Sequence, residues 1–123
     1  MLNAKKVLFR HIGDIEPVGT SHGVGEKRVV AIREDVGYPI TQMARTRLKA
    51  GDWVESHIHP TMDEHFFFLE GKCEITIDEV NTCICQAEDY LFIPANHAHA
   101  LRLLADTLMI TMGVETCSKS ISD

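Results

Sequence analysis

The chain has 123 residues, 45% of them hydrophobic and 24% charged, and its 18 acidic and 12 basic side chains give a formal net charge of −6. This length and composition are typical of one globular domain and exclude a disordered or fibrous chain. The acidic excess argues against a nucleic-acid partner, which would need a basic face. No apolar run reaches the ~18 residues that a membrane-spanning helix requires, so we expect no membrane partner. The unusual feature is the histidine count, which is seven.

The N-terminus and the cysteines predict a cytoplasmic protein. The apolar stretch before Arg10 is only three residues long, which is too short for a signal peptide. The four cysteines are Cys73, Cys83, Cys85 and Cys117. Their spacing resembles no small secreted disulfide framework. We interpret Cys83 and Cys85 as small core residues in preference to a metal or redox pair.

In chain order, short runs rich in β-branched and aromatic residues are separated by Gly, Pro, Asp and Asn at intervals of about ten residues. They predict strands over residues 6–9, 27–34, 41–49, 53–59, 64–70, 72–78, 82–86, 90–93, 99–104 and 107–114. The run 72–78 alternates, with Cys73, Ile75 and Ile77 on one face, as in a half-buried strand. So many short strands in one domain predict a β-sandwich or barrel. Residues 1–26 form a looser segment, and 117–123 form a polar tail.

Two histidines on one predicted strand indicate a metal site. His57 and His59 are two residues apart, so both rings project from the same face with Cβ atoms ~7 Å apart. Pro60 ends that strand, and Glu64 begins the next one. His99 opens a later strand that can lie across the barrel from the first pair. Three neutral imidazoles and a carboxylate suit divalent iron, manganese, nickel, copper or zinc, whereas calcium and magnesium prefer oxygen ligands.

The stretch 51–71 resembles the first sequence motif of the cupin family without a gap. The residues that fall at the family's positions are Gly51, His57, His59, Glu64 and Gly71. This resemblance implies an all-β double-stranded β-helix, the jelly-roll or cupin barrel. It further implies one cupin domain over residues 1–123, with its core motifs in 51–103. The metal ligands that it implies are His57, His59, Glu64 and His99.

The second cupin motif matches in part. Pro94 and His99 fall where the family has its proline and its last histidine ligand. Glu88 and Asn96 stand where glycines are usual, and Leu103 replaces an asparagine. Asn tolerates positive φ, so Asn96 can take over a turn glycine. None of the three departures falls at a ligand position, so they affect turn geometry and the lining of the pocket. A cupin that keeps the motif but binds no metal stays an alternative.

The remaining histidines are weaker candidates. We interpret His11 and His22 as ordinary surface or core groups. His65 alternates away from Glu64 and should face the other side of its strand. His97 shares the parity of His99 and is therefore a candidate pocket residue.

Three further side chains are candidates for the substrate pocket. Phe66 and Phe68 share the parity of Glu64 and can form an apolar wall, although filling the core explains them equally well. Gln42 shares a face of its strand with core positions and would orient a ligand. Arg45 and Arg47 then face outward, where they would suit a homodimer contact.

The function that these residues indicate is a metal-binding protein whose mononuclear site binds a small oxygenated molecule. As an enzyme it would be a dioxygenase or an isomerase of a sugar or keto acid. The alternative is a non-catalytic module that binds or senses a small molecule. The sequence assigns no catalytic residue, because it offers no clear general acid or base beyond the ligands.

Overall fold

The computed structural model describes residues 5–116, which form an almost entirely β structure. The described strands are β1 (Val18–Gly19), β2 (Glu26–Ile32), β3 (Ile40–Leu48), β4 (Trp53–His57), β5 (Met62–Glu70), β6 (Lys72–Ile77), β7 (Asn81–Gln86), β8 (Tyr90–Ile93), β9 (His99–Leu103) and β10 (Thr107–Glu115). A 3₁₀ turn (Ile12–Asp14) and the short helix α1 (Arg33–Val36) complete them. No helix within 5–116 has the length and hydropathy to cross a membrane. The predicted polar tail 117–123, with Cys117, lies outside the described residues.

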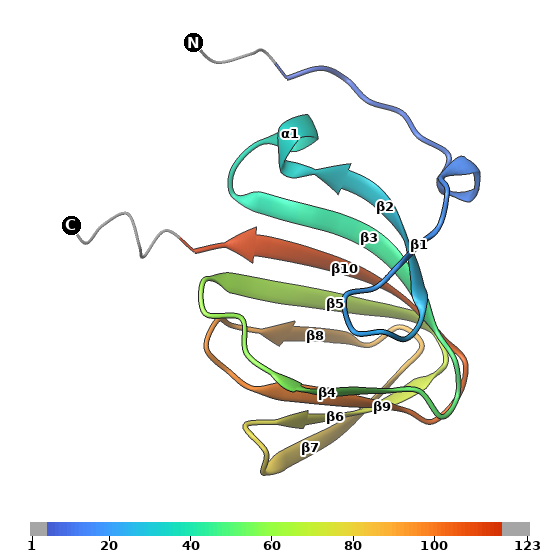
Figure 1. Ribbon diagram of the computed structural model, residues 1–123, viewed down its shortest axis with the longest axis vertical. Helices are drawn as coiled ribbons and strands as arrows, with labels where there is room; N and C mark the ends of the chain where they lie inside the picture. The colour runs from blue at the N-terminus through green and yellow to red at the C-terminus, as the bar shows by residue number, and fades with distance from the viewer. Residues whose placement is uncertain (1–4, 117–123) are drawn as a thin grey trace, which may run out of the picture.

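The strands form two antiparallel sheets (Figure 1). The larger sheet has the order β1-β2-β3-β10-β5-β8 and the smaller one has the order β4-β9-β6-β7. Strands far apart in the sequence pair within each sheet, as β3 does with β10 and β4 with β9. This arrangement confirms the predicted all-β jelly-roll barrel.

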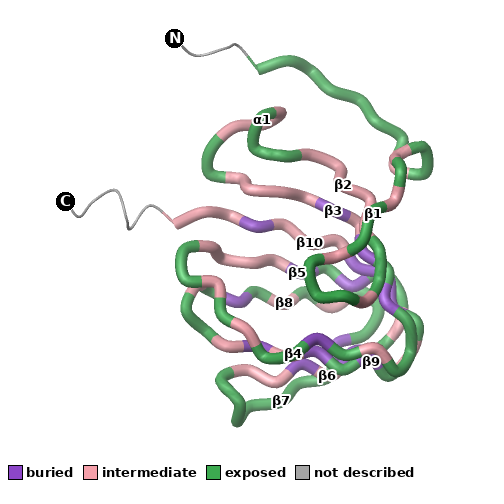
Figure 2. The backbone as a smooth tube through the Cα atoms, viewed as in Figure 1, coloured by how far each residue is buried: buried purple, intermediate pink, exposed green. Residues whose placement is uncertain are grey.

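The core lies between the two sheets, where each strand contributes every second side chain. On β6, Cys73 and Ile75 are buried while Lys72 is exposed, as the alternation predicted. Phe68 of β5 in the larger sheet is also fully buried, as is Leu103 of β9, which lies beside Cys73 in the smaller sheet. Figure 2 shows this burial on β4, β6 and β9, in contrast to the mostly exposed segment before β1. Burial of apolar surface stabilises the barrel by roughly 25 cal/mol per Å².

The strands predicted after residue 26 all form, with small shifts at their ends. The strand predicted over 6–9 does not form, because no described strand lies beside it and Val7 and Phe9 remain exposed. The short strand β1 pairs with the start of β2 instead. β2 ends at Ile32, whose N–H donates to Oδ2 of Asp35 (3.2 Å), and the chain turns there into α1.

A bulge interrupts the pairing of β4 with β9. Val54 lies opposite Leu101 and His57 lies opposite His99, so three residue steps on β4 match two on β9. The extra residue breaks the strict alternation. As a result Val54 and His57 both face inward, although they are separated by an odd number of residues. β4 ends at His57, so His59 lies in the following loop and not on the strand that the sequence predicted.

Two glycines beside the strands differ in how much room surrounds them. Gly51 and Gly71 both have positive φ, +91° and +98°. A Cβ added at Gly51 meets open space, whereas at Gly71 it would overlap the backbone carbonyl of Asp106. The second position therefore requires glycine for two reasons, its conformation and its close approach to the neighbouring chain.

We expect Gly51→Ala to lower the free energy of unfolding by about 1–2 kcal/mol, the cost of a side chain in the left-handed region. Gly71→Ala should cost about 1–3 kcal/mol more, because the overlap forces the backbone to move. Urea unfolding of the two variants measures both losses. Equal losses would contradict the close contact at Gly71.

Candidate metal centre

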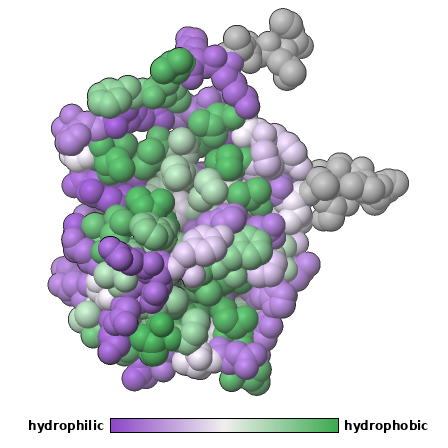
Figure 3. All heavy atoms as spheres, turned by 180° about the vertical axis from the view of Figure 1, so that it is seen from behind, coloured by the Kyte–Doolittle hydropathy of each residue, from purple (hydrophilic) through white to green (hydrophobic). Residues whose placement is uncertain are grey.

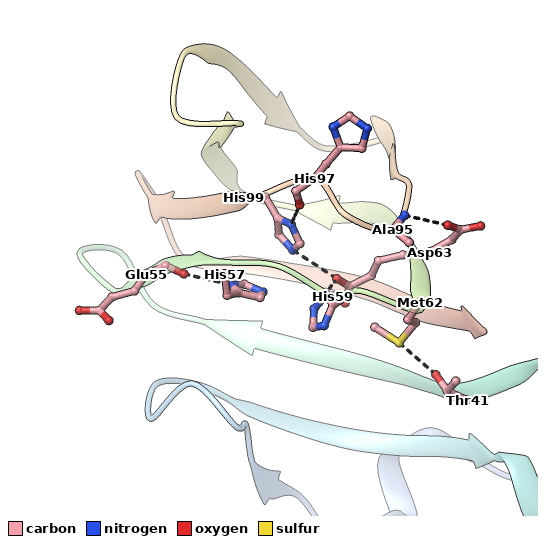
Figure 4. A network of polar contacts seen from close by, with 10 residues as sticks. Thr41, Glu55, His57, His59, Met62, Asp63, Ala95, His97 and His99 are labelled. Atoms are coloured by element: carbon pink, nitrogen blue, oxygen red, sulfur yellow. Dashed lines mark hydrogen bonds and ion pairs between the residues drawn. The ribbon is translucent and has the colours of Figure 1, made fainter. Parts of the chain in front are cut away.

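Three histidines converge inside one end of the barrel. His57 ends β4, His59 lies in the loop that follows, and His99 begins β9. One ring nitrogen from each lies within 4.8 Å of the others. In Figure 4 the three rings point toward one another. From β5, Oε1 of Glu64 lies 3.4 Å from His59 Nε2 and 3.5 Å from His99 Nε2. The structure thus brings together the four side chains predicted as ligands.

Backbone carbonyls fix the orientation of two of the rings. His57 Nδ1 lies 2.9 Å from the carbonyl oxygen of Glu55, and His99 Nδ1 lies 3.0 Å from that of His97. A carbonyl oxygen can only accept, so each Nδ1 donates its proton. In the neutral ring, Nε2 then carries the lone pair, which is the form that binds a metal.

His99 Nε2 is a buried polar atom that makes no hydrogen bond within residues 5–116; its polar neighbour is Oε1 of Glu64, at 3.5 Å. The residue is 1% exposed, and among the described residues its Nε2 accepts or donates no hydrogen bond. A buried polar group left in this way costs about 1–3 kcal/mol. A cation among the three histidines and Glu64 would satisfy this nitrogen, and nitrogen donors with one carboxylate suit a transition metal. The residues present therefore fit such an ion.

The protein environment shifts the pKa values of the cluster in different directions. Burial is the main cause that lowers the pKa of His57, which keeps the ring neutral. Contact with Glu64 raises the pKa of His59. Burial acts to raise the pKa of Glu64, but its contacts with His59 and His99 outweigh burial and lower that pKa to about 2. At neutral pH the cluster thus offers a carboxylate and a neutral imidazole.

A cavity of about 200 Å³ opens beside the cluster. Two of the predicted pocket residues, Gln42 of β3 and Phe66 of β5, line this cavity. Phe68 does not line it: this ring is fully buried in the core, stacked against Phe66 with centroids 6.3 Å apart. The sequence correctly predicted that Phe68 shares the inner face of β5 with Phe66, but Phe68 lies two residues farther along the strand.

The structure does not bring His97, the fourth predicted pocket residue, to the cavity. Its Nδ1 lies 2.8 Å from Oδ2 of Asp78, and in Figure 4 its ring points away from the other histidines. The parity that linked it to His99 fails because His97 lies in the loop before β9, where side chains do not alternate. His65 faces the outer side of β5, as predicted, with Nδ1 2.7 Å from Tyr90 Oη.

Sequence reasoning missed two titratable residues of the cavity. His22, interpreted as incidental, lies in the β1–β2 loop with its ring centroid 4.6 Å from that of His57. Lys27 of β2 lines the same cavity. Both reach the site through contacts between distant segments, so no local pattern marks them. The nearest local signal is the pair Gly23 and Gly25, whose positive φ values turn the loop back toward the barrel.

The two residues that replace the usual glycines both have the positive φ that glycine adopts most readily. Asn96 has a φ of +72°, and Glu88, the other replacement, has a φ of +74°. The Asn96 N–H donates to the carbonyl of His59 (2.9 Å), and the Ala95 N–H donates to Oδ1 of Asp63 (2.8 Å). These bonds hold the two ligand-bearing segments against each other.

Comparisons with known proteins agree on the fold. A family model described as "Cupin domain" matches residues 44–113. "Uncharacterized protein YdbB" of Bacillus subtilis (strain 168) is 37% identical over 57 residues, which cover 46% of this chain and 48% of that protein, about half its length.

Solved structures with the same fold have different names. A predicted oxalate decarboxylase from Thermotoga maritima has a TM-score of 0.80 and 18% identity, and the match covers 88% of this chain and 99% of that one. Ectoine synthase from P. lautus has a TM-score of 0.77 and 18% identity, with 93% and 83% covered. The polyketide cyclase RemF from Streptomyces resistomycificus has a TM-score of 0.75 and 14% identity, with 89% and 80% covered. Identities this low show the fold alone.

In the metal-free protein we expect His57 and His99 to be Nδ1–H tautomers, because the carbonyls of Glu55 and His97 accept from Nδ1. Long-range ¹⁵N–¹H correlation spectra at neutral pH distinguish the two tautomers of each ring. A proton on Nε2 of either ring would contradict the proposed orientation of its lone pair.

Proposed function

This chain belongs to the cupin family, and on that premise we propose that it binds one divalent transition metal and, beside it, a small oxygenated molecule. The metal is iron, manganese, nickel, copper or zinc, and its ligands are His57, His59, Glu64 and His99. The observation that carries this proposal is the buried His99 Nε2, which has no hydrogen-bond partner among the residues that the structure describes. Two further imidazoles and a carboxylate surround it.

The proposed activity is that of a dioxygenase or of an isomerase of a sugar or keto acid. A metal bound here supplies Lewis-acid polarisation of a ligand oxygen or, if it is iron, dioxygen chemistry. The chain itself holds the ligand: Phe66 forms an apolar wall that excludes water, and the Gln42 amide orients a polar group. His22, an exposed side chain that lines the same cavity, offers the ligand a further polar group.

The alternative function is non-catalytic binding or sensing of a small molecule. Beyond the four proposed ligands, the titratable side chains that line the cavity within residues 5–116 are His22 and Lys27. His97, predicted from the sequence as a pocket residue, faces away from the cluster. This scarcity of acid–base groups favours binding without turnover. Consumption of a bound compound would distinguish the enzyme from the binding module.

The proposal treats residues 1–123 as one cupin domain in the cytoplasm. The coverage of 88% to 93% of the chain by the solved structures supports a single domain. Free thiols at Cys73, Cys83 and Cys85 support a reducing compartment. We propose no nucleic-acid or membrane partner.

We further propose that the protein is a homodimer that pairs through the outer face of β5 and β8. Four apolar or aromatic side chains on this face are 36% to 59% exposed: Phe67, Leu69, Tyr90 and Phe92. We call them the β5–β8 patch. Figure 3, the view from behind, shows hydrophobic residues spread across the middle of the molecule. Exposed apolar patches mark interaction surfaces. Arg45 and Arg47, the contact predicted from the sequence, lie outside the cavity on β3.

The metal proposal predicts about one transition-metal equivalent per chain, in keeping with one mononuclear site. The double variant His57→Ala with His59→Ala should bind none, because it removes two of the three nitrogens. Elemental analysis of protein purified without a histidine tag measures this. The matched control is His65→Ala with His97→Ala, whose rings lie outside the cavity and which should keep its metal. Metal retained in the first variant, or lost in the control, would disprove the assignment.

The dimer proposal predicts that the wild-type chain has twice its monomer mass in light scattering. Phe67→Lys places a charge in the β5–β8 patch and should give monomers. Ile84→Lys changes a side chain with similar exposure on β7, 45% against 42%, and should leave the mass unchanged. A monomeric wild type, or an Ile84→Lys variant that dissociates, would rule out this interface.

A further inference from the structure

Lys27 is a cation on the wall of the cavity. It lies on β2 opposite Thr46 of β3, and its side chain lines the cavity together with Gln42. Its ammonium donates a hydrogen bond to Oε1 of Gln42 (2.9 Å). An ammonium group has three donors, so this contact uses one of them.

Lys27 makes no ion pair with the acidic side chains that the structure describes. Within residues 5–116, no carboxylate lies within ion-pair distance of it. The ion pairs described for lysine and arginine are Arg10–Asp35, Arg33–Glu115 and Arg102–Glu74. Glu64 lines the same cavity, but its carboxylate contacts His59 and His99. A partly buried cation with only a neutral amide for a partner attracts an anion.

The contact with Lys27 also determines which way the Gln42 amide points. Because an ammonium group can only donate, Oε1 of Gln42 must face Lys27. The amide NH₂ is then directed elsewhere and can donate to a ligand. Lys27 and Gln42 thus present an ammonium and an amide donor side by side, which matches the two oxygens of a carboxylate.

The size and the rest of the lining limit the ligand to a small one. A volume of about 200 Å³ corresponds to about six or seven water molecules. The hydroxyls of Thr46 and Thr111 line the same space, as do the apolar side chains of Leu48 and Met109. One ammonium matches one negative charge at this end of the cavity, which favours a carboxylate over a doubly charged phosphate.

We infer that Lys27 and Gln42 form an anion subsite that holds the carboxylate of a small organic acid, while the other end of the acid lies at the histidine cluster. The part of this inference that concerns the second end rests on the proposed function. The anion subsite itself does not depend on a metal, since Lys27 and Gln42 contact each other directly.

Calorimetric titration with matched acids tests the subsite. The probes are succinate and glutarate, each compared with its monoamide, which has the same number of heavy atoms but one charge fewer. The titrations use the full chain, both zinc-loaded and metal-free. Three variants accompany the wild type. Lys27→Met removes the cation, and the isosteric Gln42→Glu gives Lys27 an internal counter-ion. Lys49→Met removes an exposed lysine outside the cavity and serves as the control.

We expect at least one diacid to bind the wild type about tenfold more tightly than its monoamide, the effect of a charged hydrogen bond. In Lys27→Met and Gln42→Glu this ratio should fall to about one while the zinc content stays the same, and Lys49→Met should keep the wild-type ratio.

Three results would overturn the inference: no diacid binds, the preference persists in Lys27→Met, or inorganic phosphate binds more tightly than either diacid. Loss of zinc from Lys27→Met would also overturn it, because the subsite would not then be separate from the metal. In the metal-free protein the remaining carboxylate of the monoamide can also reach Lys27, so there the subsite alone is tested by whether Lys27→Met weakens the binding of the diacids and of the monoamides. Failure of the proposed function appears separately, as a wild-type chain that binds no metal.

Discussion

The bulge in β4 determines where the functional groups lie. It places one extra residue between Val54 and His57, so that Glu55 and Ser56 both face solvent while His57 lies opposite His99. With strict alternation from Val54, the side chain of His57 would lie on the outer face of the sheet. The bulge therefore brings a ring from β4 and a ring from β9 to the same inner surface, and the Glu55 carbonyl exposed by it orients the His57 ring.

The barrel has an apolar end and a polar end, and the polar one is costly without a ligand. Phe68 and Leu103 fill the apolar part of the space between the sheets. At the other end, His99 is buried just as deeply, but its Nε2 makes no hydrogen bond with any other residue of 5–116. A folded protein tolerates such an atom when something else compensates for it. A transition metal would compensate at the histidine cluster, and an anion would compensate at Lys27. Both ends of a bound acid would then meet groups that the described part of the chain leaves unsatisfied.

Much of the fold and of the site could be predicted from local pattern. Strands with clear alternation were placed correctly, and the resemblance of the histidine spacing to the cupin motifs implied the four side chains that converge, His57, His59, Glu64 and His99. Contacts between segments far apart in the sequence could not be predicted, and this explains why His22 and Lys27 were missed. The prediction that His97 lines the pocket was wrong, because side chains alternate regularly only inside a strand and His97 lies in the loop before β9. The predicted strand 6–9 failed for a related reason: β propensity does not supply a neighbouring strand to pair with.

Anomalous diffraction from crystals of the metal-loaded protein is the most direct test of the metal site. Data are collected at the absorption edge of the metal that elemental analysis identifies. We predict one anomalous peak per chain, bonded to Nε2 of His57 and His99 and to His59 at about 2.0–2.2 Å, with Glu64 beside it. A peak at another position, or three histidines without a metal in protein that contains one equivalent, would contradict the proposed site.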